Sequence, residues 1–131
     1  MFEIAVTRTF RATHAVRIGG AMEEPHAHDW RVHATIAGGA LDDDDLLCDF
    51  HAVEASLDAM LDRWRDADLN HQPPFAGGPL PTAERVAEAI AAGLALALRG
   101  VLPEGAHVRR VAVTEAPGCE AAVTPGEAAQ R

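Results

Sequence analysis

The 131-residue sequence has no lysine, only two cysteines and no long apolar run. Because its eleven basic residues are all arginines, Schiff-base chemistry and a P-loop lysine are excluded, and arginines would have to bind any anionic substrate. No run reaches about 18 apolar residues, and the N-terminus shows no charged-then-apolar leader. We therefore expect a soluble, cytoplasmic protein.

The two cysteines and the net charge limit the cellular compartment and the partners that we expect. Cys48 and Cys119 are far apart and fit no C-x-x-C pattern, which is typical of free thiols in a reducing compartment. The net charge of −9 disfavours binding to nucleic acid or to anionic membranes, because both depend on cationic side chains. We expect neither as a partner.

The length predicts one domain over residues 1–131, with a flexible tail at about 125–131. Alternating apolar residues predict a strand over 2–10, a glycine- and proline-containing loop to about residue 25, and a second strand over 28–37. Only Arg8 breaks the alternation of the first strand.

Helical periodicity begins at Phe50 and runs to about Trp64. The loop HQPPFAGGPLP separates this helix from a second one, which Thr82 would cap and Gly100 would end. Strand patterns return at 107–115 and near 120–124. The order β-β-α-α-β-β predicts an α+β domain, a four-stranded antiparallel sheet with two helices on one face. The open edges of such a sheet favour oligomerisation.

Three of the seven histidines stand out because they are expected at one end of this sheet. His26 and His28 share a strand parity in the stretch EEPHAHDWRVHATI, and His14 lies on the parity of Phe10 at the end of the first strand. Three converging imidazoles form a zinc site with an open fourth position. The alternative is a hydrogen-bonded polar cluster.

Glu115 is the next candidate, because it ends a strand on the parity of Val111 and Val113, where an apolar residue is expected. A carboxylate there can accept two parallel hydrogen bonds from the amino-pyrimidinone edge of a pterin. The alternative is a solvated residue at the start of a turn.

Together these motifs resemble the 6-pyruvoyltetrahydropterin and 6-carboxytetrahydropterin synthase family over residues 2 to about 124. The resemblance rests on F-x-x-x-H from Phe10, P-H-x-H-D-W from Pro25, Asp49-Phe50, Leu69-Asn70, Pro81-Thr82-x-Glu84 and Thr114-Glu115. It implies the tunnelling fold (T-fold), with two trimers stacked into a homohexamer and active sites between subunits.

The resemblance also implies the contents of the site. It places zinc on His14, His26 and His28, and a pterin substrate on Glu115, with Thr82 and Thr114 as further substrate-binding residues. Family members act on 7,8-dihydroneopterin triphosphate.

The sequence departs from the family in its proton-transfer residues. The loop before His26 lacks the family's catalytic cysteine and has Met22 about where it is expected, so Glu23 or Glu24 is a candidate replacement, unless both are solvated loop charges. The usual Asp-His pair is replaced by Arg65 and Asp66.

A histidine is the natural substitute, since imidazole titrates near neutral pH. We favour His71 over His51 as the general base.

Three functions follow from these residues. The first is a zinc-dependent carbon–oxygen lyase of the synthase type with altered proton transfer. The second is a zinc- and pterin-binding homologue without the standard turnover. The third is an aldolase-type variant that cleaves the side chain to give 6-hydroxymethyldihydropterin.

Overall fold

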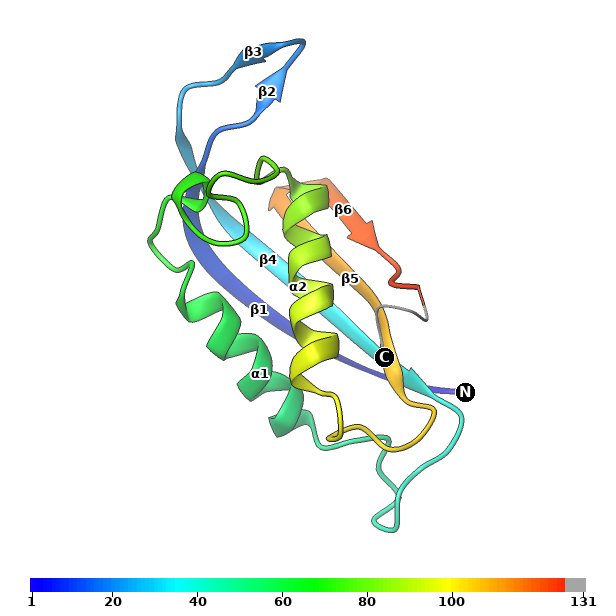
Figure 1. The fold of residues 1–131 in the computed structure, drawn as a ribbon. Helices are drawn as coiled ribbons and strands as arrows, with labels where there is room; N and C mark the ends of the chain where they lie inside the picture. The colour runs from blue at the N-terminus through cyan, green and yellow to red at the C-terminus, as the bar shows by residue number, and fades with distance from the viewer. Residues whose placement is uncertain (127–131) are drawn as a thin grey trace.

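The computed structural model describes residues 1–126 and contains a four-stranded antiparallel sheet with two helices on one face (Figure 1). The sheet has the order β1-β4-β5-β6. Its strands are β1 (Phe2–His14), β4 (His26–Gly38), β5 (His107–Ala116) and β6 (Cys119–Val123), and its helices are α1 (Phe50–Asp62) and α2 (Ala83–Ala97). The predicted α+β fold and element order are confirmed. The predicted tail at 125–131 lies outside the described residues except for Pro125 and Gly126.

The segment predicted as a loop up to residue 25 differs from the expectation. Strand β1 continues to His14 because its last residues stay paired with the start of β4. A small hairpin of β2 (Arg17–Ile18) and β3 (Ala21–Met22) then projects beyond the sheet (Figure 1). Gly19 and Gly20 make its turn with φ of 59° and 86°, values that favour glycine.

Polar caps fix the helices that flank the site. Thr82 accepts a hydrogen bond from the backbone of Arg85 at the start of α2, as predicted. Asp49, whose cap was not predicted, accepts one from the backbone of His51 at the start of α1. The sequence did not predict η1 (Leu69–His71), a short 3-10 helix capped by Asp68. Helix α2 ends at Ala97, just before the turn that contains Gly100.

The core lies between the sheet and the two helices. Phe10 and Trp30 stack at 5.9 Å, and the buried core includes Val32, Ile36, Leu57, Leu61, Ile90, Leu94, Val111 and Val113. Arg8 reaches α1, where its guanidinium binds Asp58 and Glu54, so its departure from the apolar alternation is explained by ion pairs that raise its pKa.

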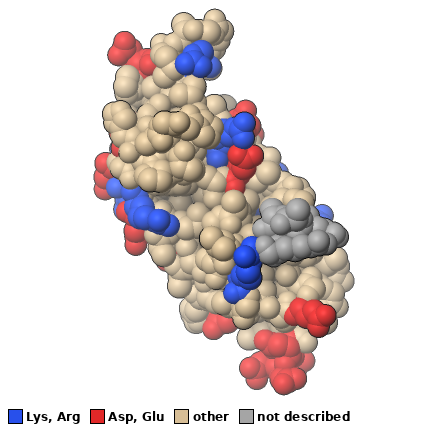
Figure 2. Space-filling model, in the orientation of Figure 1, with Lys and Arg blue, Asp and Glu red and all other residues tan. Residues whose placement is uncertain are grey.

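The surface carries charges of both signs, as expected from the composition of the sequence (Figure 2). Basic and acidic side chains are interspersed on the face in Figure 2, and acidic side chains gather at the end where Figure 1 shows the loop before α1.

None of the helices in residues 1–126 has the length and apolar character needed to cross a membrane.

Candidate metal centre

The pairing of β1 with β4 brings three imidazoles to one end of the sheet. His14 lies directly opposite His26, and Ala12 lies opposite His28. Because alternate residues of a strand point to the same face, all three histidines point to the helix-covered face. Their ring centroids lie 4.7 to 5.2 Å apart.

Glu115, near the end of β5, completes this group. Its Oε1 lies 2.9 Å from Nε2 of His14 and 3.0 Å from Nε2 of His28, and the two Nε2 atoms of His14 and His26 are 3.2 Å apart. One ligand atom from each of the four residues lies within 4.8 Å of the others. The described part of the chain therefore holds a compact set of three nitrogen ligands and one oxygen ligand.

Backbone carbonyls orient two of the imidazoles. The carbonyl oxygen of Pro81, just before α2, lies 2.8 Å from Nδ1 of the fully buried His14. The carbonyl oxygen of Glu24 lies 2.9 Å from Nδ1 of His26. A carbonyl can only accept, so each Nδ1 carries the proton and each Nε2 offers its lone pair to the centre of the cluster.

His28 tests whether a metal fits these residues. Its Nε2 is buried and makes no hydrogen bond, since its approach to Glu115 lacks hydrogen-bond geometry. Burial lowers the pKa of His28 more than Glu115 raises it, and the neighbouring histidines lower it further. The neutral ring therefore has an unused lone pair in the site.

The distance between the ligand atoms of His14 and His26 agrees with a bound metal ion. Tetrahedral Zn²⁺ with bonds of about 2.0–2.1 Å requires ligand atoms roughly 3.3 Å apart, close to the 3.2 Å between His14 and His26. Imidazoles are ligands that zinc prefers. The three imidazoles therefore fit a bound metal ion of this kind, with the carboxylate of Glu115 beside it.

Glu115 has a position that the sequence analysis did not predict. We expected it to anchor a pterin, and the structure places it within ligand distance of the histidines, with 27% of its side chain exposed. Its parity with Val111 and Val113 was the available signal, because both of those side chains are buried on the same face.

The two threonines predicted to bind substrate have different surroundings. Thr114 lies one residue before Glu115 in β5, so its side chain points to the opposite face, where it lines a hollow with Arg31, His33, Arg110 and Glu120. Thr82 caps α2 next to Pro81, whose carbonyl orients His14. Neither threonine belongs to the four-residue cluster.

The candidate acid–base residues also lie outside the cluster. Glu23 is half-buried, and its carboxylate accepts a hydrogen bond from the backbone of Val16 at 3.3 Å across the β2–β3 hairpin. Glu24 has an exposed side chain and contacts His26 through its backbone. Glu23 is therefore the more firmly held of the two.

The exposed His71 has a neighbouring carboxylate, since its Nδ1 lies 3.6 Å from an oxygen of Asp68. His51 has Asp49 as its neighbour at 3.1 Å and is 88% exposed. Arg65 and Asp66, at the positions of the family's Asp-His pair, bond the backbone of β1 at Thr9 and Arg11.

Solved structures share this fold over nearly their full length. A Caenorhabditis elegans 6-pyruvoyl tetrahydropterin synthase has a TM-score of 0.79 at 15% identity, and the match covers 95% of this chain and 96% of that one. The Plasmodium falciparum enzyme gives 0.73 at 15% identity, with coverage of 95% and 97%. A Plasmodium vivax enzyme with a replaced catalytic glutamate gives 0.74 at 14% identity, with coverage of 95% and 98%. At these identities the similarity establishes the fold.

Sequence comparison adds the family. A search of curated proteins finds no significant match. The sequence profile of 6-pyruvoyl tetrahydropterin synthase, in contrast, matches residues 3–126, almost the whole chain. The chain therefore belongs to the 6-pyruvoyl tetrahydropterin synthase family, whose T-fold it has.

Proposed function

We propose that the protein is a zinc-dependent carbon–oxygen lyase acting on 7,8-dihydroneopterin triphosphate or a closely related pterin. Family membership supports an enzyme of the pterin synthase type. The observation that carries the proposal is the convergence of His14, His26, His28 and Glu115 at one end of the sheet. When bound, zinc would polarise the hydroxyl or keto groups of the pterin side chain.

Glu115 is the residue proposed to hold the pterin ring. A carboxylate can accept two parallel hydrogen bonds from an amino-pyrimidinone edge, and this pairing is both strong and directional. Since Oε1 lies beside His14 and His28, the position of Glu115 would bring the pterin side chain next to the metal site. Thr82 and Thr114 are proposed to complete the substrate contacts, Thr114 through its backbone because its side chain points to the other face of the sheet.

Proton transfer is proposed to depend on Glu23, with Glu24 and His71 as the other candidates. In the elimination, a base takes a proton from a side-chain carbon while the neighbouring carbon–oxygen bond to triphosphate breaks. Glu23 is favoured because it is half-buried and tied to the hairpin that leads to His26. In the Plasmodium vivax relative, the replaced catalytic residue is a glutamate. His71, with Asp68 beside it, is the candidate for the second proton-transfer step.

Specific residues favour the two rival functions. Arg65 and Asp66, in place of the Asp-His pair, favour a pterin-binding homologue without the standard turnover. Glu23 in place of cysteine favours the aldolase-type variant, in which a carbon–carbon bond breaks to leave 6-hydroxymethyldihydropterin.

The proposal also covers the oligomeric state of the protein and its cellular compartment. The outer edges of β1 and β6 have no strand partner within the described chain, and we propose that they join neighbouring subunits into trimers, two of which form a hexamer. Cys48 and Cys119 are both free, which supports a reducing compartment and hence the cytoplasm.

Product analysis separates these functions. The zinc-loaded protein is incubated with 7,8-dihydroneopterin triphosphate, with and without an aldehyde-trapping reagent, and every pterin product is identified by mass. A 6-pyruvoyl or 6-carboxy product supports the lyase, and a 6-hydroxymethyl product supports the aldolase-type variant. Unchanged substrate, bound tightly by zinc-loaded protein, would refute the lyase and support the binding protein.

Variants assign the base. Glu23→Gln should reduce turnover by roughly 10²–10⁴-fold, the usual contribution of a general base, with zinc content unchanged. Glu104→Gln, which removes an exposed carboxylate elsewhere, is the matched control. Equal turnover in the two variants would transfer the assignment to Glu24 or His71.

A further inference from the structure

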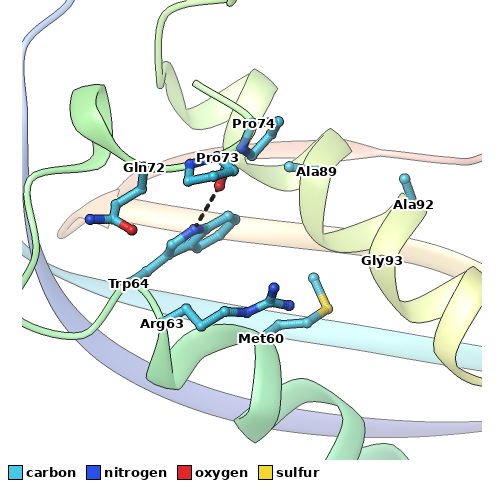
Figure 3. A pocket seen from close by; sticks show the side chains of 9 residues that line it. All are labelled: Met60, Arg63, Trp64, Gln72, Pro73, Pro74, Ala89, Ala92 and Gly93. Atoms are coloured by element: carbon cyan, nitrogen blue, oxygen red, sulfur yellow. Dashed lines mark hydrogen bonds between the residues drawn. The ribbon is translucent and has the colours of Figure 1, made fainter. Parts of the chain in front are cut away.

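A pocket lies between the two helices, away from the histidine cluster. It has a volume of about 400 Å³ and is formed by the end of α1, the loop after η1 and the middle of α2 (Figure 3). Its lining residues are Met60, Arg63, Trp64, Gln72, Pro73, Pro74, Ala89, Ala92 and Gly93. It shares no residue with the metal centre.

The walls of this inter-helix pocket are held in place by packing. The Trp64 indole donates its N–H to the carbonyl of Pro73 at 3.2 Å, and its ring packs against Phe75 at 5.5 Å. Met60 lies against Gly93, in the space that a Cβ at that position would need. The pocket is therefore formed before any ligand arrives, and its size is within the roughly 300–1,000 Å³ typical of small-molecule sites.

The lining is apolar except for two side chains, Arg63 and Gln72. Figure 3 shows the Arg63 guanidinium lying along the pocket between Trp64 and Met60. No carboxylate in residues 1–126 forms an ion pair with it, whereas the neighbouring Arg65 pairs with Asp62. Since Pro73 already occupies the indole N–H, the guanidinium is the main polar group left for a ligand.

We propose that this inter-helix pocket binds a small aromatic carboxylate. The aromatic ring fills the space between Trp64 and α2, and the carboxylate forms a bidentate pair with Arg63. A planar guanidinium matches a carboxylate in geometry and charge, and the exposed Arg63 can take up this pair without losing an ion-pair partner within residues 1–126. An apolar ring also gains from burial against the proline, methionine and alanine side chains. The protein would then have a ligand site separate from the one that processes the pterin.

The test titrates the zinc-loaded, full-length protein with 2-naphthoate, followed by calorimetry, with neutral 2-naphthamide as the comparison. We expect saturable binding of one naphthoate per chain and at least about tenfold weaker binding of the amide. Arg63→Gln should weaken naphthoate binding by about tenfold or more, because a charge-assisted pair is lost. Arg85→Gln, which removes an arginine paired with Glu88 elsewhere on α2, should not change it.

A second variant tests the pocket itself. Ala92 is exposed at the pocket wall, so Ala92→Leu should fill the space and abolish naphthoate binding while leaving the melting temperature and zinc content unchanged. Absence of saturable naphthoate binding by the wild type would overturn the proposal. So would binding that is equal in the wild type, Arg63→Gln and Ala92→Leu proteins. Neither outcome bears on pterin turnover, which is measured separately.

Discussion

His28 is the single residue on which metal binding is most directly tested. Its buried Nε2 has no hydrogen bond, and burial lowers its pKa, which favours the neutral form that a metal ligand needs. His28→Ala should lower zinc affinity by at least roughly 100-fold, more than the loss of an outer-shell partner costs. Zinc content after dialysis against a weak chelator measures this.

The matched control is His33→Ala, on the same strand. His33 lies on the other face of β4, where Nδ1 contacts the hydroxyl of Thr7 at 3.0 Å, so its removal should leave zinc content unchanged. Equal zinc content in the two variants would contradict the metal centre.

Glu115 offers two roles that one substitution distinguishes. Glu115→Gln keeps the size of the side chain but loses the charge that a pterin edge would pair with, so pterin affinity should fall by roughly tenfold or more. Zinc affinity should fall too if Glu115 is a resident ligand and stay unchanged if it serves the pterin alone. Glu104→Gln, which removes an exposed carboxylate elsewhere, is the control. Unchanged affinity for both zinc and pterin would remove Glu115 from the site.

The two thiols should differ in reactivity. Burial raises the pKa of Cys48, and the carboxylates of Asp49 and Asp42 raise it further, so little thiolate forms there at pH 8. Cys119 is exposed at the start of β6. We expect iodoacetamide to leave Cys48 unmodified in the folded protein and to modify it in urea, as read by peptide mass. Rapid labelling of Cys48 without denaturant would contradict its burial.

At the scale of elements, the loop around η1 supports the end of β1, where the proposed metal ligand His14 lies. The side chain of Asn70 accepts from the backbone N–H of Ala15 and donates to its carbonyl, both at 2.8 Å. The N–H of Thr13 bonds the carbonyl of Ala67 at 2.9 Å. This loop therefore fixes the backbone on both sides of His14.

Asn70→Ala should accordingly destabilise the protein by about 1–3 kcal/mol, because it leaves the backbone groups of Ala15 without partners. Zinc affinity should fall by roughly 10–100-fold, as for other residues that orient a ligand. His71→Ala, one residue on and exposed, should affect neither value. Denaturant unfolding and zinc titration measure the two effects, and an Asn70→Ala protein with wild-type values for both would refute this supporting role.

The elements with regular periodicity could be predicted from the sequence, because one face of each is buried. The alternation around Val32 and the helical spacing around Leu57 report that burial directly. The apolar alternation ends at Phe10, and only the parity of His14 indicated a longer strand, since β1 is held that far by long-range pairing with His26. The β2–β3 hairpin and η1 are too short to show a period.

Part of the candidate metal centre could be predicted from the sequence. Strand parity is enough to bring the three histidines together. The approach of Glu115 to His14 depends on how β4 and β5 align, with Arg31 opposite Thr114. Sequence parity gives the face of a side chain but not the register between strands.

At the scale of the whole molecule, the sheet of the described chain has two edge strands, β1 and β6. The outer edge of β6 has no partner strand within residues 1–126, and that of β1 is bonded to other backbone groups only near its end, where Arg11 and Thr13 pair with the loop at Asp66 and Ala67. Strand β1 is thirteen residues long, and a long open edge of that kind is normally paired, covered or blocked by charge. Closure with neighbouring sheets would satisfy both edges at once.

Assembly through these edges has a mass and an exchange signature. Six chains of 13.9 kDa should elute from a sizing column as a particle with a light-scattering mass of about 83 kDa, because three chains close the sheet edges and two such trimers stack. The amides of β1 before Thr13 that point away from β4 should then exchange slowly with deuterium, although no strand within residues 1–126 accepts from them. Amides of the exposed β2–β3 turn serve as the freely exchanging comparison. A 13.9 kDa particle whose outward β1 amides exchange as fast as that turn would show that the edges stay open and that the proposed hexamer does not form.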